Sequence, residues 1–252
     1  MLSNSQQKHI RKLHQKKYRQ KYNEFLVEGK KGVKEAIISD REVISVIFSK
    51  NNDKNVNSLL NLAKKQGINT LECDQTQVDQ IKTTQTFPGI MAIVKAEKWS
   101  LKDFKTDEPV ICFDQISDPG NLGTIIRSSD WFGYNNILLS ENSVEAHNEK
   151  VVRSSMGSFF RSKIIESRNL LSDLKWLKEE GYSIYGLDTE GESLKESDIS
   201  NQDSVFVFGN ESHGISDGVA KLLDNTYTIE GEGGAESLNV GVSAAIVLFE
   251  IS

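Results

Sequence analysis

The pattern of apolar and polar positions predicts short strands that alternate with amphipathic helices along most of the chain. In the first third, the predicted strands are 25–28, 43–48, 68–73 and 89–94, and the predicted helices are 3–23, 31–39, 56–66 and 75–81. Strands and helices that alternate at this spacing indicate a small α/β domain, which we place at residues 1–95. Residues 96–108 carry scattered charge and little periodicity, which favours a linker.

The alternation restarts after Pro109, so residues 109–252 are expected to form a second α/β domain. The predicted strands are 110–113, 136–139, 183–187, 205–208 and 227–229, and the predicted helices are 122–132, 151–160, 170–180 and a last helix that Ser237 caps. Polar, glycine-bearing loops follow Phe113, Phe208 and Ile229. Open α/β sheets bind ligands beyond the carboxyl ends of their strands, so these three loops are the candidate site.

The last helix is apolar on almost every face. One face carries Val240, Ala244, Val247 and Leu248, and most of the remainder is covered by Val242, Ala245, Ile246 and Phe249. A helix of this kind is usually buried, so we expect the C-terminal segment to lie in the core.

Charge is distributed unevenly along the 252 residues, whose net charge is −6. No acidic residue occurs in residues 1–23, where the basic side chains are Lys8, Arg11, Lys12, Lys16, Lys17, Arg19 and Lys21. Such a run is either a solvated arm or a surface that binds the phosphates of RNA.

Several classes of protein are disfavoured by what the sequence lacks. Cys73 and Cys112 lie in apolar contexts without CxxC spacing, as expected of structural thiols in a reduced protein. We find no signal peptide, no apolar span of membrane length and no metal-ligand spacing, and we therefore expect a cytoplasmic protein without a metal. The glycines of residues 231–234 have the wrong spacing for a dinucleotide fingerprint, which disfavours an ordinary nucleotide-dependent enzyme.

Three loop segments carry a family resemblance. Residues 118–127 (DPGNLGTIIR), 208–215 (FGNESHGI) and 236–240 (ESLNV) resemble, in order and spacing, motifs 1, 2 and 3 of the SpoU branch of the SPOUT methyltransferases. Residues 25–29 (FLVEG) resemble the start of the small RNA-recognition domain of TrmH-type ribosomal RNA methyltransferases, a domain similar to ribosomal proteins.

The resemblance implies transfer of a methyl group from S-adenosyl-L-methionine to a ribose 2′-hydroxyl of RNA. It favours ribosomal RNA, with transfer RNA or a non-catalytic RNA-binding role as alternatives. It also implies an α/β catalytic domain with a deep trefoil knot, and a homodimer whose active sites lie across the subunit interface. Under this interpretation the basic residues 8–21 bind RNA.

The resemblance further assigns roles to individual residues. The cofactor pocket is expected to contain Thr189, Phe208, Gly209, Ile229 and Leu238, and the catalytic residues are expected to be Arg127, Asn121, Glu211, Ser237 and Asn239. Arg127 either removes the hydroxyl proton, which costs about 7 kcal/mol because a guanidinium is almost never neutral at neutral pH, or stabilises developing negative charge.

Two of these residues keep alternative or additional roles, and one position outside the set departs from the family pattern. Asn121 could cap its helix, bind at the active site, or do both. Glu211 is expected to hold either Arg127 or the neighbouring loop. Glu230 stands where the family usually has proline.

Overall fold

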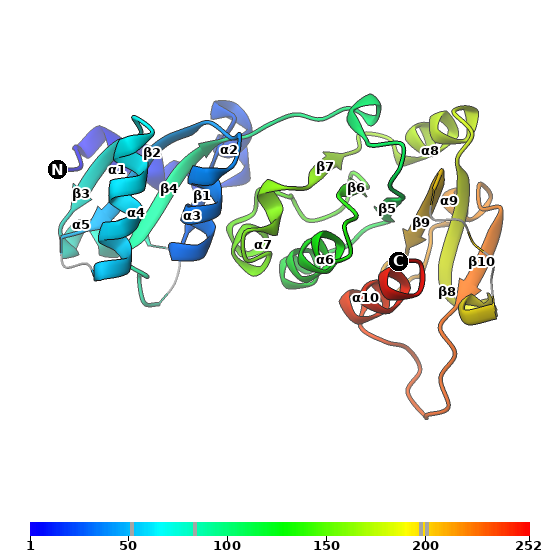
Figure 1. Ribbon diagram of the computed structural model, residues 1–252. Coiled ribbons are helices and arrows are strands. Elements are labelled where there is room, and N and C mark those ends of the chain that lie inside the picture. The colour runs from blue at the N-terminus through cyan, green and yellow to red at the C-terminus, as the bar shows by residue number, and fades with distance from the viewer. Residues whose placement is uncertain (51–52, 83–84, 197–198, 200–201) are drawn as a thin grey trace. The chain divides into compact units, whose positions relative to one another are not determined.

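Two compact units make up the chain (Figure 1). This computed structural model describes residues 1–50, 53–82, 85–196, 199 and 202–252. The first unit consists of residues 1–97 and 147–160, and the second of residues 98–146 and 161–252. The chain thus leaves the second unit after Ala146 and returns to it at Arg161.

The first unit is built on a four-stranded sheet in the order β1-β4-β2-β3, in which only β2 and β3 are parallel. Its strands are β1 (Glu24–Glu28), β2 (Val43–Ser49), β3 (Asn69–Cys73) and β4 (Ile90–Lys95), and its helices are α1 (Asn4–Leu13), α2 (Lys16–Tyr22), α3 (Lys30–Ile38), α4 (Lys54–Lys65), α5 (Gln75–Ile81) and α7 (Glu149–Ser154). The prediction of one basic helix over residues 3–23 is wrong, because the extended backbone of Gln15 separates α1 from α2.

Aromatic side chains attach residues 147–160 to the first unit. Phe25 of β1 lies 4.8 Å from His147 and 5.4 Å from Phe159, measured between ring centroids. The helix predicted over 151–160 ends at Ser154, because Met156 and Gly157 have φ angles of 54° and 98°. A short 3-10 turn, η2 (Ser158–Phe160), then places the two phenylalanines.

A six-stranded parallel sheet in the order β10-β8-β9-β5-β6-β7 forms the centre of the second unit. Its strands are β5 (Val110–Phe113), β6 (Asn136–Leu139), β7 (Lys163–Glu166), β8 (Ser183–Ser193), β9 (Ser204–Phe208) and β10 (Asn225–Thr228), and its helices are α6 (Pro119–Trp131), α8 (Leu170–Glu179), α9 (Asp217–Ala220) and α10 (Val240–Glu250), with the short 3-10 turns η1 (Leu101–Asp103) and η3 (Leu194–Glu196). The sequence prediction missed β7 and α9, and it ended β8 six residues early.

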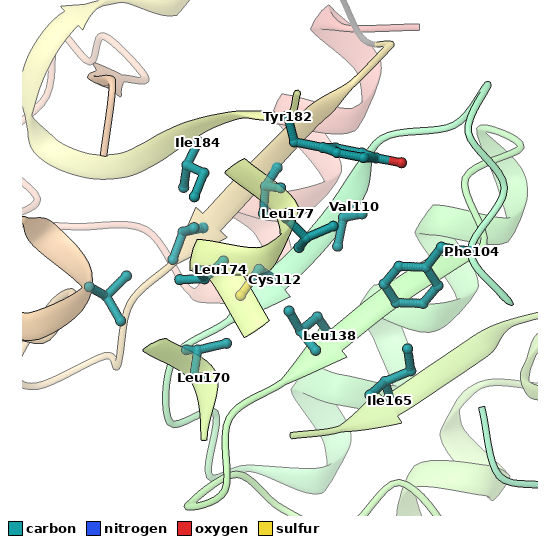
Figure 2. Close-up of a cluster of buried hydrophobic side chains, with 13 residues drawn as sticks. Phe104, Val110, Cys112, Leu138, Ile165, Leu170, Leu174, Leu177, Tyr182 and Ile184 are labelled. Atoms are coloured by element: carbon teal, nitrogen blue, oxygen red, sulfur yellow. The ribbon is translucent and has the colours of Figure 1, made fainter. Parts of the chain in front are cut away.

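Helix α8 covers one face of this sheet, as Figure 2 shows. Leu170, Leu174 and Leu177 pack on Val110, Cys112 and further strand residues. Because side chains alternate across a strand, Ile111 and Phe113 point to the opposite face, and they too are fully buried. Burial on both faces explains why the central strands are continuous apolar runs.

The C-terminal helix α10 packs against α6, with one apolar face buried and the other open. Val240, Ala244, Val247 and Leu248 are buried as predicted, and the Tyr134 hydroxyl donates a hydrogen bond of 2.8 Å to the carbonyl of Ile251 just after the helix. Val242 and Phe249, however, remain 48% and 64% exposed. The expectation that the whole helix is core is therefore wrong for its outer face.

The fold class, a small α/β unit and a larger one, is confirmed, whereas the trefoil knot remains a prediction. No helix in the described part of the chain is long and apolar enough to cross a membrane.

Candidate active site

Helix α6 begins in the first motif with an aspartate cap. The Asp118 carboxylate accepts a hydrogen bond of 2.8 Å from the backbone N–H of Asn121, and Pro119 occupies the first helical turn. Asn121 is therefore not the N-cap that the sequence allowed. Its carboxamide is available for contacts outside the helix.

Hydrogen bonds between side chains join the three motifs. Asn121 Nδ2 donates to Glu211 Oε1 at 2.5 Å, and Asn239 Nδ2 donates to Asn121 Oδ1 at 3.2 Å. We call these three residues the polar network. They come from segments 90 and 118 residues apart in the chain, so the fold brings together three of the five predicted catalytic residues.

Asn239 also begins the last helix. Its Oδ1 accepts a hydrogen bond of 2.9 Å from the backbone N–H of Gly241, which makes Asn239 the N-cap of α10. Ser237, the predicted cap, is instead exposed in the loop before the helix. One carboxamide thus both starts α10 and holds Asn121.

Arg127 lies on the exposed face of α6, two turns after Asn121. Six residues of helix rise about 9 Å, so Arg127 is separated from the polar network along the helix axis. Within the described part of the chain it makes no hydrogen bond or ion pair, and the Glu211 carboxylate contacts Asn121 instead. The predicted contact between Glu211 and Arg127 is therefore not formed, and the carboxylate instead accepts from Asn121 in the first turn of α6.

The second motif forms a tight backbone loop at the end of β9. The N–H groups of Asn210 and Gly214 each donate to the other residue's carbonyl at 2.9 Å. A Cβ on Gly209 would lie 2.2 Å from the carbonyl carbon of Gly214, so only glycine fits here. Two residues that the sequence analysis missed hold this loop: Asn210, whose Nδ2 donates to the Gln115 carbonyl at 2.8 Å, and the buried Asp114, which accepts from the Ser216 N–H at 2.9 Å.

Four of the five residues predicted to bind the cofactor lie at one edge of the sheet. Gly209 and Ile229 directly follow the last residues of β9 and β10, and Thr189 lies within β8, two residues after the part of that strand that pairs with β9. The Thr228 hydroxyl donates to the Thr189 carbonyl at 3.2 Å. Phe208, the last residue of β9, is buried and stacks on Phe113 with ring centroids 5.2 Å apart, so it can offer a ligand only its main chain. Leu238 is exposed in the loop that joins β10 to α10 (Figure 1).

The basic residues of the first unit separate into an exposed set and a buried one. Lys8, Arg11, Lys16 and Lys17 are exposed, and Lys12 is half-buried with its Nζ 3.4 Å from the Tyr22 hydroxyl. Arg19 is only 6% exposed and donates a hydrogen bond of 2.9 Å to the Leu13 carbonyl. The prediction that Arg19 binds RNA is therefore corrected, because this side chain ties α2 to the end of α1.

The described residues offer the site neither a reactive thiol nor a set of metal ligands. Both thiols are free and buried, and burial raises the pKa of Cys73 to about 11 and that of Cys112 well above its usual value. Among the described residues, no group of three or more His, Cys, Asp or Glu side chains could hold a metal ion.

Comparison with known proteins gives matches over both units. Residues 108–249 match the SpoU rRNA Methylase family, and residues 4–92 match the MRM3-like substrate binding domain. The 23S rRNA (guanosine(2553)-2′-O)-methyltransferase RlmP of Bacillus subtilis (strain 168) is 31% identical over 248 residues, which cover 98% of this chain and 96% of the relative.

Two solved structures have the same fold over nearly the whole chain. The AdoMet-bound rRNA methyltransferase from Sinorhizobium meliloti has a TM-score of 0.87 at 27% identity and covers 100% of this chain and 95% of its own. The SpoU methyltransferase AviRb from Streptomyces viridochromogenes has a TM-score of 0.87 at 24% identity, with 98% and 97% covered, and supports the fold alone.

These matches confirm the family that the three motifs indicated, and with it an enzyme that uses S-adenosylmethionine as methyl donor. The match spans more than half of the chain and contains the whole polar network. This chain belongs to the SpoU rRNA methylase family.

Proposed function

We propose that this protein transfers a methyl group from S-adenosylmethionine to a ribose 2′-hydroxyl of ribosomal RNA. The observation that carries the proposal is the polar network, which joins the three motif segments through Asn121, Glu211 and Asn239. The relative from Bacillus subtilis, which matches over nearly its full length, is named as a 2′-O-methyltransferase of 23S ribosomal RNA. Ribosomal RNA as substrate also implies that the protein acts in the cytoplasm.

The carboxyl edge of β8, β9 and β10 fits the methyl donor. Half-buried Gly209 follows the last residue of β9 and offers its main chain at this edge, and Phe208 is held in place by its stacking on Phe113. Half-buried Ile229 and exposed Leu238 offer apolar surface for the adenosine group. We therefore assign cofactor binding to these residues and to Thr189.

Arg127 is the residue that we assign to the transfer step. When bound, S-adenosylmethionine would supply a methyl group on a positively charged sulfur. As the 2′-oxygen bonds to that carbon, the carbon–sulfur bond would break and leave neutral S-adenosylhomocysteine, and the hydroxyl proton would pass to solvent water. A charged Arg127 binds the adjacent phosphate and stabilises negative charge on the oxygen without any change in protonation. Removing the proton with Arg127 would first require a neutral guanidinium, at a cost of about 7 kcal/mol.

The polar network and Ser237 position the reacting groups. Asn121 is held on both sides of its carboxamide, by Glu211 and by Asn239, so its orientation is fixed before RNA binds. Ser237 lies exposed two residues before Asn239 and is available to the RNA backbone or to the cofactor.

A second copy of the chain completes the site. Helices α6 and α10 border a groove of about 430 Å³ whose lining includes Asn121 and Asn239 of the polar network and the apolar side chains Val242 and Phe249. An exposed apolar surface beside polar groups is typical of an interface between subunits. In the homodimer, Arg127 of one subunit acts beside the polar network of its partner.

Mixing two inactive variants tests this shared site. Arg127→Ala and Asn239→Ala are each expected to be inactive alone, whereas an equal mixture regains about a quarter of the wild-type rate because half of the dimers contain one intact site. A mixture that stays inactive although mixed dimers form contradicts a site shared between subunits. Phe249→Glu is expected to shift the sedimentation coefficient to that of a monomer, and Ile38→Glu, at another exposed apolar residue, is not.

The exposed basic residues of α1 and α2 bind RNA phosphates. Each phosphate contact that is lost lowers, by about 1, the magnitude of the slope of the logarithm of the RNA-binding constant against the logarithm of the salt concentration. The double substitution Lys16→Gln and Lys17→Gln is therefore expected to lower the slope by about 2 without changing which RNA is preferred.

The direct test of the function is transfer of labelled methyl groups to total ribosomal RNA and to transfer RNA. Wild type is compared with Arg127→Ala and with Arg168→Ala, a control at an exposed arginine. Label on the ribose of ribosomal RNA that only Arg127→Ala loses supports the proposal. Label on transfer RNA alone would identify transfer RNA, and not ribosomal RNA, as the substrate. Failure to bind S-adenosylmethionine leaves an RNA-binding protein without activity.

A further inference from the structure

The first unit contains a cavity that the transfer reaction does not use. Its volume is about 170 Å³, and it lies between α1 and the row in which β2, β3 and β4 pair through Ser45, Asn69 and Ile93. Gln6 and His9 of α1 and Glu24 of β1 supply further polar groups to its lining. We call this cavity the base pocket.

Several polar groups of the base pocket have no protein partner. Ser45 is only 4% exposed, yet neither its hydroxyl nor the Asn69 carboxamide makes a hydrogen bond to any described residue. The Gln6 oxygen accepts from the Ser3 N–H at 2.8 Å, which leaves the NH₂ group of Gln6 available. Polar groups that line a cavity and have no protein partner are available to hydrogen-bond a polar ligand.

The polar rim is held by one short contact. His9 Nε2 lies 2.6 Å from Glu24 Oε2, and the two side chains are 32% and 16% exposed. The His9 ring also meets the edge of Tyr22, with centroids 4.8 Å apart. One oxygen of Glu24 is thereby occupied, and the other remains available to a donor on the ligand.

Ile10, Ile44, Leu71 and Ile93 form the apolar part of the lining. An apolar wall with a polar rim suits a flat heterocycle, whose faces pack on the apolar side chains and whose edge forms hydrogen bonds with the polar groups. A cavity of about 150 Å³ accepts a benzene molecule, so this one, which is partly open to solvent, has room for a single six-membered ring with small substituents. The size favours a pyrimidine over the larger purine bases.

The surface beside the base pocket is basic and aromatic. Tyr22, the neighbour of His9, stacks with Tyr18 at a centroid distance of 6.1 Å and an interplanar angle of 13°. Lys12 Nζ lies 5.4 Å from the Tyr18 ring, and Lys21 Nζ lies 5.8 Å from the Tyr22 ring. Interleaved lysines and tyrosines are typical of sites for single-stranded nucleic acid.

We propose that the base pocket takes one unpaired pyrimidine base of the RNA substrate, with its phosphates on the lysines of α1 and α2. Sequence-specific recognition of RNA commonly uses unpaired bases, because the grooves of A-form helices hide most base identity. The inference rests on the proposed function for its choice of RNA, and it adds a site that selects a nucleotide away from the methylated ribose.

Binding of short single-stranded RNA to the full-length protein tests the base pocket without the methyl donor. Fluorescence anisotropy at one salt concentration compares hexamers of uridine, cytidine and adenosine. We expect at least one pyrimidine hexamer to bind about tenfold more tightly than the adenosine hexamer, a difference of about 1.4 kcal/mol. Ser45→Leu fills the cavity and is expected to abolish this preference while leaving the affinity for the adenosine hexamer unchanged.

Two further variants keep the test decisive. Ser58→Leu places the same side chain on the exposed surface of α4 and should retain the preference. Asn69→Ala changes only an exposed rim residue, so it keeps the test valid if Ser45→Leu does not fold. It should lower the preference for the pyrimidine hexamer over the adenosine hexamer about threefold.

Three results would overturn the base pocket: equal binding of all hexamers, a preference that survives Ser45→Leu, or an equal loss of affinity for every hexamer in that variant. The methyl-transfer assay distinguishes this failure from failure of the proposed function. Wild-type protein that methylates ribosomal RNA without any pyrimidine preference refutes the pocket alone.

Discussion

The loop after β9 leaves no room for a methyl group at Gly209. A Cβ there would lie 2.2 Å from the carbonyl carbon of Gly214 and 2.4 Å from the nitrogen of Ile215. An ordinary contact begins at 3.4 Å, so Gly209→Ala requires a shift of 3.4 − 2.2, or about 1.2 Å. Because both opposing atoms belong to the backbone, the loop itself must move.

That movement breaks the paired hydrogen bonds between Asn210 and Gly214, each 2.9 Å long. Each contributes about 0.5–1.5 kcal/mol, so we expect Gly209→Ala to lower the free energy of unfolding of the second unit by about 1–3 kcal/mol. The same loop carries Glu211, and its displacement should weaken both cofactor binding and methyl transfer.

Urea unfolding followed by tryptophan fluorescence measures this loss. Trp99, Trp131 and Trp176 all belong to the second unit, so the signal reports that unit alone. Gly231→Ala is the matched control, because a Cβ at Gly231 meets nothing within 4 Å, and its effect should stay within about 0.5 kcal/mol. If Gly209→Ala unfolds at the same urea concentration as the control, the reasoning from the tight loop is refuted.

Three further predictions concern acid stability, the cap of α6 and the transfer step. Burial against Phe25 and Phe159 lowers the pKa of His147 from 6.5 to about 4, with smaller contributions from the positive charges of Arg41 and Arg19. Below pH 6.5 the His147 imidazole of the unfolded chain therefore binds a proton more readily than that of the folded chain, so acid lowers the stability of the first unit. Hydrogen exchange should show this unit about 1–2 kcal/mol less stable at pH 5 than at pH 7, and His147→Phe should remove that difference. Asp118→Ala should cost about 1 kcal/mol in urea unfolding, whereas Asp118→Asn should cost much less; equal losses would exclude the capping role. Arg127→Lys should slow methyl transfer about a hundredfold with the S-adenosylmethionine affinity unchanged in calorimetry, and a normal rate would show that the planar guanidinium is not needed.

Some elements could be predicted from the sequence because local pattern and burial agree in them. Strands β5 and β9 are continuous apolar runs because both faces are covered, and they were placed within one residue. Strand β7 was missed because two isoleucines between Lys163 and Glu166 form too short a pattern. The second half of β8 contains no apolar residue and forms by pairing with β10 across a register shift, which no local pattern reveals.

The candidate site was predictable as a set of loops but not as a set of contacts. Strand ends and glycines placed the loops at one edge of the sheet. Whether Ser237 or Asn239 capped α10 could not be decided locally, because both residue types are good caps. Asn239 is the cap in the folded chain, where its carboxamide also reaches Asn121.

The path of residues 147–160 has a consequence for engineering chimaeras. These residues supply His147, Phe159 and Phe160 to the core around Phe25, although strands of the other unit precede and follow them in sequence. The first unit is thus encoded in two separate pieces. Exchanging only residues 1–97 with a relative would place a foreign β1 against native aromatic residues, so recombination between members of the family should succeed only when both pieces are exchanged together.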